Sequence, residues 1–70
     1  MGENLDAMTE WELRQWAASN RGRVSRELTD YARLKAEALE ARARGEVGLA
    51  LSLEGECDRL YGRLPRRERW

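Results

Sequence analysis

The sequence from Ser25 to Leu64 reads SRELTDYARLKAEALEARARGEVGLALSLEGECDRLYGRL, and it consists of two helix-period segments separated by Gly45. With 100° per residue and Cys57 as origin, the apolar residues of the second segment fall on one broad face. The members of this face are Val47, Leu49, Ala50, Leu53, Leu60, Tyr61 and Leu64. The first segment has a main stripe of its own, centred on Leu39. The members of the main stripe are Val24, Leu28, Ala32, Ala36 and Ala43.

Gly45 decides how the two segments meet. A glycine after the last periodic residue usually ends a helix in the left-handed conformation, and a short loop then makes the next helix antiparallel. The sequence therefore predicts helices over residues 25–44 and 46–64. The alternative is one unbroken helix through Gly45, at a cost of about 1 kcal/mol relative to alanine. The hairpin is favoured, because an isolated long helix would leave both stripes exposed to water.

The core of this hairpin can be predicted from the two stripes. Four residues of the second helix are expected to be buried against four of the first. They are Leu53, Cys57, Leu60 and Leu64 against Leu28, Ala32, Leu39 and Ala43.

A short helix over residues 10–19 is predicted ahead of the hairpin. Thr9 and Glu12 have the spacing of a capping box, and Met8 and Leu13 have that of a hydrophobic staple. Such a short helix is marginal alone, so its apolar residues must dock on something.

Trp11 and Trp16 give this short helix more apolar surface than two turns need. A second stripe on the first long helix, directed away from the main stripe, offers a docking site. Its members are Tyr31, Leu34, Ala38 and Ala41. Docking of the short helix there and contact with another molecule through the same residues are both open.

Length and composition limit the ways in which this chain can be stabilised. Seventy residues make one domain, residues 1–70, and a lone core of this size is marginal. One cysteine forms no internal disulfide, and one cysteine without any histidine makes no usual zinc site. The expected fold is therefore all-α: an antiparallel helical hairpin with a short Trp-bearing N-terminal helix, completed as a bundle by a second chain.

Neither end of the sequence is expected to be part of the core. Residues 1–6 resemble a frayed acidic leader, and residues 65–70 a charged tail after the helix-ending Pro65. No apolar run has the length of a membrane span, and the N-terminus is not typical of a signal peptide. We therefore expect a cytoplasmic protein without membrane contact.

No combination of residues predicts catalysis. The chain has no histidine to serve as a base, and Cys57 lies at the centre of an apolar face, where a thiol is inert. Paired carboxylates such as Glu37 and Glu40 lack the histidines that di-iron bundles use. We expect no enzyme, no metal, no cofactor and no small-molecule substrate.

Gly48, Gly55 and Gly62 recur every seven residues on the helix face away from the predicted core, with Leu51 on the same side. Each exposed helical glycine costs roughly 0.5 to 1 kcal/mol relative to alanine. Such a stripe would let another helix approach closely, by analogy with membrane helices, with Leu51 as its anchor. Unselected surface is an equal alternative.

An arginine-rich pole follows from the antiparallel hairpin, since the start of its first helix lies beside the end of its second. The pole comprises Arg21, Arg23, Arg26, Arg63, Arg66, Arg67 and Arg69, with Trp70 nearby. It could bind phosphates or an acidic protein surface, and Trp70 could stack on a base. Alternatively, Glu27, Asp58 and Glu68 neutralise the pole by internal pairing.

Two functional hypotheses follow. The first is a non-enzymatic helical protein–protein interaction module, most simply a homodimer or a small subunit of a larger assembly. Its candidate contacts are Trp11, Trp16, Tyr31, Leu34, Leu51 and the three glycines of the stripe. The alternative is a nucleic-acid-binding or regulatory protein that acts through the arginine pole.

Overall fold

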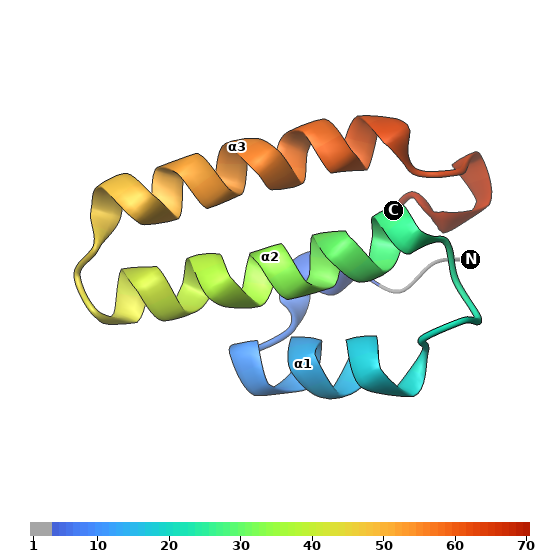
Figure 1. The fold of residues 1–70 in the computed structure, drawn as a ribbon, viewed down its shortest axis with the longest axis horizontal. Helices are drawn as coiled ribbons and strands as arrows, with labels where there is room; N and C mark the ends of the chain where they lie inside the picture. Colours follow the sequence, from blue (N-terminus) through green and yellow to red (C-terminus); the bar gives the residue numbers. More distant parts are fainter. Residues whose placement is uncertain (1–3) are drawn as a thin grey trace.

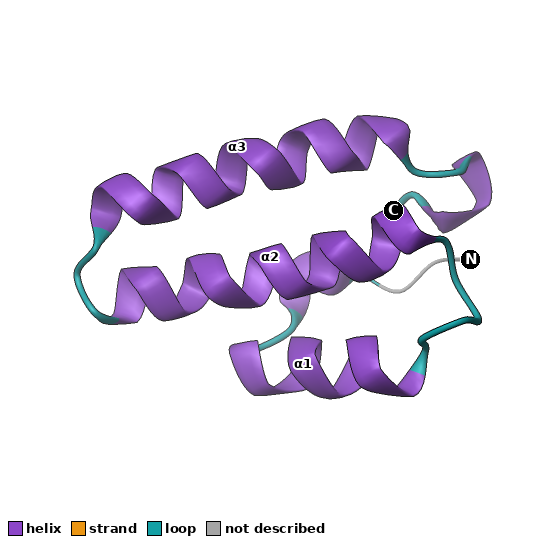
Figure 2. Ribbon diagram, viewed as in Figure 1, coloured by secondary structure: helices purple, strands orange, loops and turns teal. Residues whose placement is uncertain are grey.

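The structure is a computed structural model that describes residues 4–70 as three helices flanked by two short 3-10 turns. Helix α2 lies between α1 and α3, and no strand occurs in the described residues (Figures 1 and 2). The bounds are η1 (Leu5–Ala7), α1 (Glu10–Ser19), α2 (Arg26–Ala43), α3 (Val47–Arg63) and η2 (Arg66–Glu68). The predicted all-α class is confirmed, and each helix agrees with its predicted range to within one residue.

Gly45 ends α2 as predicted. Its φ of 79° lies in the left-handed region that glycine adopts without strain. The Glu46 amide donates to the Ala41 carbonyl at 2.8 Å, and the Gly45 amide donates to the Arg42 carbonyl at 3.0 Å. These two hydrogen bonds form a Schellman motif, and α3 then runs antiparallel to α2. The unbroken-helix alternative is excluded.

Helix α1 begins at the predicted capping box. The Thr9 hydroxyl accepts from the Glu12 amide at 3.2 Å, and the Glu12 carboxylate accepts from the Thr9 amide at 2.8 Å. Both hydrogen bonds satisfy amides that a helix start leaves without intrahelical partners. Of the staple residues, Leu13 is fully buried and Met8 packs against the core.

The predicted hairpin core is correct in part. Cys57, Leu64, Leu28 and Ala32 are buried, while Leu39, Leu53 and Leu60 are partly buried. Ala43 is exposed, so its prediction as a core residue is wrong. Helix α1 is much shorter than α2 and leaves the last turn of α2 uncovered (Figure 1).

Helices α1 and α3 occupy the opposite faces of α2 from those predicted. Arg42 forms a bidentate ion pair with Glu54 of α3, at 2.6 and 2.8 Å. Glu40, about 160° from Arg42 around the helix, instead pairs with Arg14 of α1. The second stripe therefore faces α3, and part of the main stripe, including Ala36, faces α1. Docking of α1 on the hairpin is confirmed, but its docking on the second stripe is wrong.

Both ends of the described chain belong to the core. Leu5, in the predicted leader, is fully buried, and Trp70, in the predicted tail, packs against the same cluster. Trp70 makes edge-on contacts with the rings of Tyr31 and Tyr61, at centroid distances of 5.1 and 4.9 Å. The prediction of a peripheral leader is thus wrong for residues 4–6, whereas residues 1–3 lie outside the described residues. The prediction of a peripheral tail is also wrong.

Asp6 connects the two ends through hydrogen bonds to its carboxylate. The Tyr31 hydroxyl donates at 2.7 Å and the Trp70 indole at 3.1 Å, and the ammonium of Lys35 lies 3.5 Å away. Burial alone would raise the pKa of Asp6, but these three groups outweigh it and lower the pKa below its ordinary value. Burial first, and Asp6 second, raise the pKa of Tyr31, so its hydroxyl stays protonated.

We therefore predict that stability falls in acid through Asp6. A depressed folded-state pKa stabilises the fold above the unfolded-state value of about 4, and this contribution is lost as the pH falls below it. Asp6→Asn should flatten the dependence of the unfolding free energy on pH between about pH 5 and pH 2. Urea unfolding at several pH values measures this dependence. Equal slopes for both proteins would contradict the assignment.

Candidate functional site

In residues 4–70, the side chains that could bind a metal or react as a thiol are the carboxylates and Cys57. No group of three or more carboxylate or cysteine side chains that could hold a metal ion occurs in residues 4–70. Cys57 is 1% exposed, and burial raises the pKa of its thiol to about 11. The thiol is therefore protonated at neutral pH and packs as a small apolar side chain.

The fold assembles the arginine pole at one end of the molecule. Glu68 of η2 accepts hydrogen bonds from the backbone amide and the hydroxyl of Ser25, which is the N-cap of α2. This contact places η2, with Arg66 and Arg67, beside the start of α2. The α1–α2 loop and the end of α3 lie at the same end (Figure 1).

Six of the seven predicted pole arginines are exposed and make neither an ion pair nor a side-chain hydrogen bond within residues 4–70. They are Arg21, Arg23, Arg26, Arg63, Arg66 and Arg67. The ion pairs of the described residues involve instead Arg14, Lys35, Arg42, Arg44 and Arg59. The carboxylate of Glu68, expected to neutralise the pole, is buried against Ser25. Within residues 4–70, no carboxylate therefore forms an ion pair with an arginine of the pole.

Two predicted pole residues have structural partners. The Arg69 guanidinium donates to the carbonyls of Leu64 and Gly62, at 3.1 and 2.9 Å, and so caps the end of α3. Trp70 packs against the two tyrosines and donates to Asp6. Its ring is already engaged by the core, which differs from the predicted role as a stacking platform for a base.

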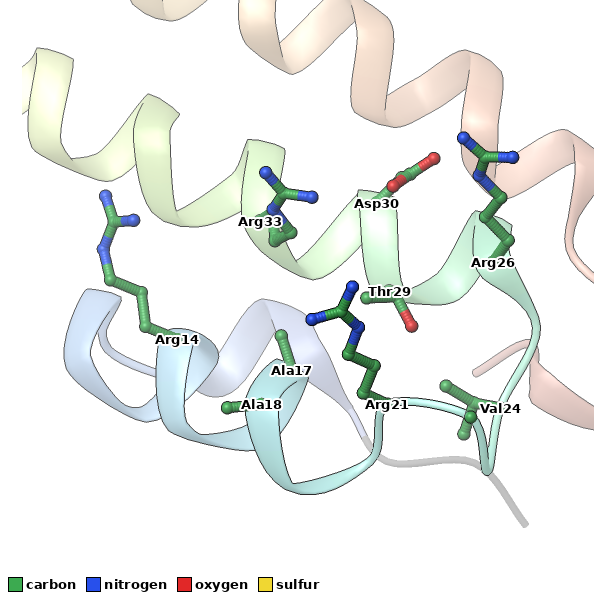
Figure 3. A pocket seen from close by; sticks show the side chains of 10 residues that line it. Arg14, Ala17, Ala18, Arg21, Val24, Arg26, Thr29, Asp30 and Arg33 are labelled. Atoms are coloured by element: carbon green, nitrogen blue, oxygen red, sulfur yellow. The ribbon is translucent and has the colours of Figure 1, made fainter.

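A groove of about 790 Å³ between α1 and α2 adjoins the pole (Figure 3). Its lining combines four arginines with small or apolar residues and one carboxylate. The lining residues are Arg14, Ala17, Ala18, Arg21, Gly22, Val24, Arg26, Thr29, Asp30 and Arg33. Sequence reasoning missed Arg14 and Arg33 as site residues. The only signal was spacing, since each lies seven residues from a pole arginine, Arg21 or Arg26.

A second surface lies at the start of α3. Val47, Leu49 and Leu51 are 53%, 48% and 57% exposed. A Cβ atom added to Gly48, Gly55 or Gly62 would have no neighbouring atom within 4 Å. The predicted glycine stripe and Leu51 are therefore open to a partner.

The other candidate contacts fall into two groups. Trp11 is 69% exposed, and Trp16 and Leu34 are partly buried against the core. Tyr31 is buried under α3 and Trp70, so its prediction as a surface contact is wrong. Trp11 and the start of α3 remain as exposed apolar surface.

Within residues 4–70, no helix combines the length and the apolar character needed to cross a membrane. Comparisons of the chain with family models, with curated proteins and with solved structures give no match. Two surfaces are therefore the candidates for function: the arginine pole with the adjoining groove, and the start of α3 with the glycine stripe.

Proposed function

We propose that this protein is a non-enzymatic helical interaction module that associates with a second copy of itself through the outer face of α3. The carrying observation is the exposure of Val47 and Leu51, which lie about 40° apart around the first turns of that helix, on the side of Gly48 and Gly55. Large aliphatic side chains grouped on one surface favour a protein interface. Burial of the exposed half of each would contribute on the order of 1 kcal/mol.

The glycine stripe supports a helix as the occupant of this face. Without side chains at Gly48 and Gly55, the backbone of a partner helix can approach α3 closely, and Leu51 between them supplies an apolar anchor. A two-fold pairing of α3 with α3 would bring the same patch of both chains together, as isologous dimers require. The two hairpins would then form the predicted four-helix bundle, with α1 on its outside.

The homodimer can be tested with Leu51→Glu. A charge at the centre of the interface should make the protein monomeric at concentrations where the wild type is dimeric, because an unpaired carboxylate is costly to bury. Sedimentation velocity from 1 to 200 μM (roughly the range for weak dimers) measures this. Gln15→Glu is the control, because it adds the same charge at an exposed residue of α1, outside the proposed interface.

Circular dichroism checks that both variants remain folded, so that a change in association is not caused by unfolding. Leu51 is more than half exposed, so both variants should keep the circular dichroism spectrum of the wild type. A wild type that stays monomeric over the whole range, or a Leu51→Glu variant that dimerises normally, would refute the homodimer.

A second candidate function is binding of nucleic acid through the arginine pole. It is favoured by the lack of ion pairs for six pole arginines within residues 4–70. Phosphate contacts by arginine supply most sequence-independent affinity, and this affinity falls as salt rises. Arg66→Ala with Arg67→Ala should weaken binding of labelled RNA or DNA at low salt. If the wild type binds neither the labelled RNA nor the labelled DNA at low salt, nucleic-acid binding through the pole is excluded.

A further inference from the structure

We propose that the groove between α1 and α2 holds a backbone phosphate of a bound nucleic acid, clamped by Arg21 and Arg33. The inference extends the second candidate function and rests on it. It assigns the contact to a concave site that includes two residues outside the predicted pole, Arg14 and Arg33.

The side chains that line the groove carry more positive than negative charge. Four guanidinium groups face a single lining carboxylate, Asp30. Arg14 already pairs with Glu10 at 3.2 Å and with Glu40 at 3.6 Å. Arg21, Arg26 and Arg33 form no ion pair within residues 4–70. The groove therefore has an excess of arginine charge that a bound anion would neutralise.

The groove has arginines on both of its sides, from α1 with the turn after it and from α2. Figure 3 shows the side chains of Arg14 and Arg21 reaching from α1 and the turn after it toward α2, with Arg21 beside the small residue Ala17, while the side chain of Arg33 lies over α2. These arginines come from both sides of the groove, so an anion between them can receive hydrogen bonds from two directions. A guanidinium presents paired N–H donors that match two phosphate oxygens. Arginines on opposite walls of a groove suit a tetrahedral phosphate better than a planar carboxylate.

The position of the groove favours a polymer of phosphates over a single one. Arg21 and Arg26 line the groove and also belong to the pole, which continues through η2 to Arg66 and Arg67. A nucleic acid backbone presents successive phosphates and can use such an extended series of arginines. An isolated phosphate would use only the groove.

The distribution of apolar residues disfavours an anionic membrane as the ligand. Segments that bind membrane surfaces combine basic residues with neighbouring apolar residues that enter the acyl region. The large apolar residues that are strongly exposed are Trp11, Val47, Leu49 and Leu51. They lie in the first turns of α1 and α3, away from the pole (Figure 1).

Fluorescence anisotropy with a labelled 12-nucleotide RNA and its DNA counterpart tests the proposal at 50 and 200 mM salt (roughly the range over which phosphate contacts are lost). The variants are Arg21→Ala with Arg33→Ala, the corresponding double lysine variant, and Arg66→Ala with Arg67→Ala. The control is Arg44→Ala with Arg59→Ala, which removes the same charge from ion-paired arginines outside the pole. All four substituted groove and control arginines are exposed, so the variants should stay folded.

The double alanine groove variant should bind at least ~10-fold more weakly at 50 mM salt than the wild type, and the slope of log K against log[salt] should become shallower by about 0.7 for the one lost phosphate contact on a single strand. The lysine variant should recover only part of the affinity, because it keeps the charge and loses the forked donors. The control should stay within about threefold of the wild type.

The other outcomes separate the two levels of the proposal. If the groove variant matches the control while the Arg66 and Arg67 variant loses affinity, the groove assignment is overturned and the second candidate function stands. If the wild type binds neither oligonucleotide, both are overturned. Binding to phosphatidylglycerol vesicles without binding to either oligonucleotide overturns nucleic acid as the ligand.

Discussion

Leu13→Ala is expected to lower the free energy of unfolding by about 2–5 kcal/mol. Leu13 is fully buried and is the larger of the two α1 residues, Leu13 and Ala17, that are buried in the main core cluster. Truncation would remove its apolar contacts and leave a cavity that the surrounding structure fills only in part. A chain of 70 residues has a total stability of about 4–10 kcal/mol, so this single substitution would remove a large fraction of it.

Trp11→Ala is the matched control in the same helix. It deletes a larger side chain, but Trp11 is 69% exposed, and its loss should change stability by no more than about 0.5 kcal/mol. Urea unfolding followed by far-ultraviolet circular dichroism compares the two variants without using tryptophan fluorescence. Equal destabilisation by both substitutions would show that α1 docks through Trp11 and that its helical phase is wrong.

Glu68→Ala is expected to lower the free energy of unfolding by about 1–3 kcal/mol. Glu68 is 8% exposed and accepts hydrogen bonds from the amide and the hydroxyl of Ser25. The same hydroxyl accepts from the Leu28 amide at 3.1 Å and so caps α2. Loss of the carboxylate would leave the Ser25 amide without its partner and release the hydroxyl from the orientation in which it caps the helix.

A double-mutant cycle with Ser25→Ala tests this coupling. If Glu68 acts through Ser25, the double variant should be more stable than the sum of the single effects implies, with an interaction energy of about 0.5–3 kcal/mol. Denaturant unfolding of the four proteins gives that energy. Additive effects would mean that the two residues stabilise the ends of the chain independently.

The arginine pole was only partly predictable. Its membership followed from the antiparallel hairpin, which placed Arg21, Arg26 and Arg66 at one end. The groove did not follow, because Arg14 and Arg33 line it only when α1 packs beside α2 on one particular face. The engagement of Trp70 by Tyr31 and Tyr61 also depends on how the last residues fold back. Nothing in the local sequence around Trp70 determines that packing.

The helices and their ends can be predicted from local sequence, because capping and helix termination depend on residues a few positions apart. Thr9 and Glu12 form the capping box that begins α1, Ser25 caps α2, and Gly45 takes the left-handed conformation that ends it. Two features depend on long-range packing instead: which helix covers which face of α2, and the burial of both ends of the described chain in the core. The two stripes of α2 are both built from alanine and larger apolar residues, and neither specifies its neighbour. Long-range contacts, such as those of Asp6 with Tyr31 and Trp70, settle that choice.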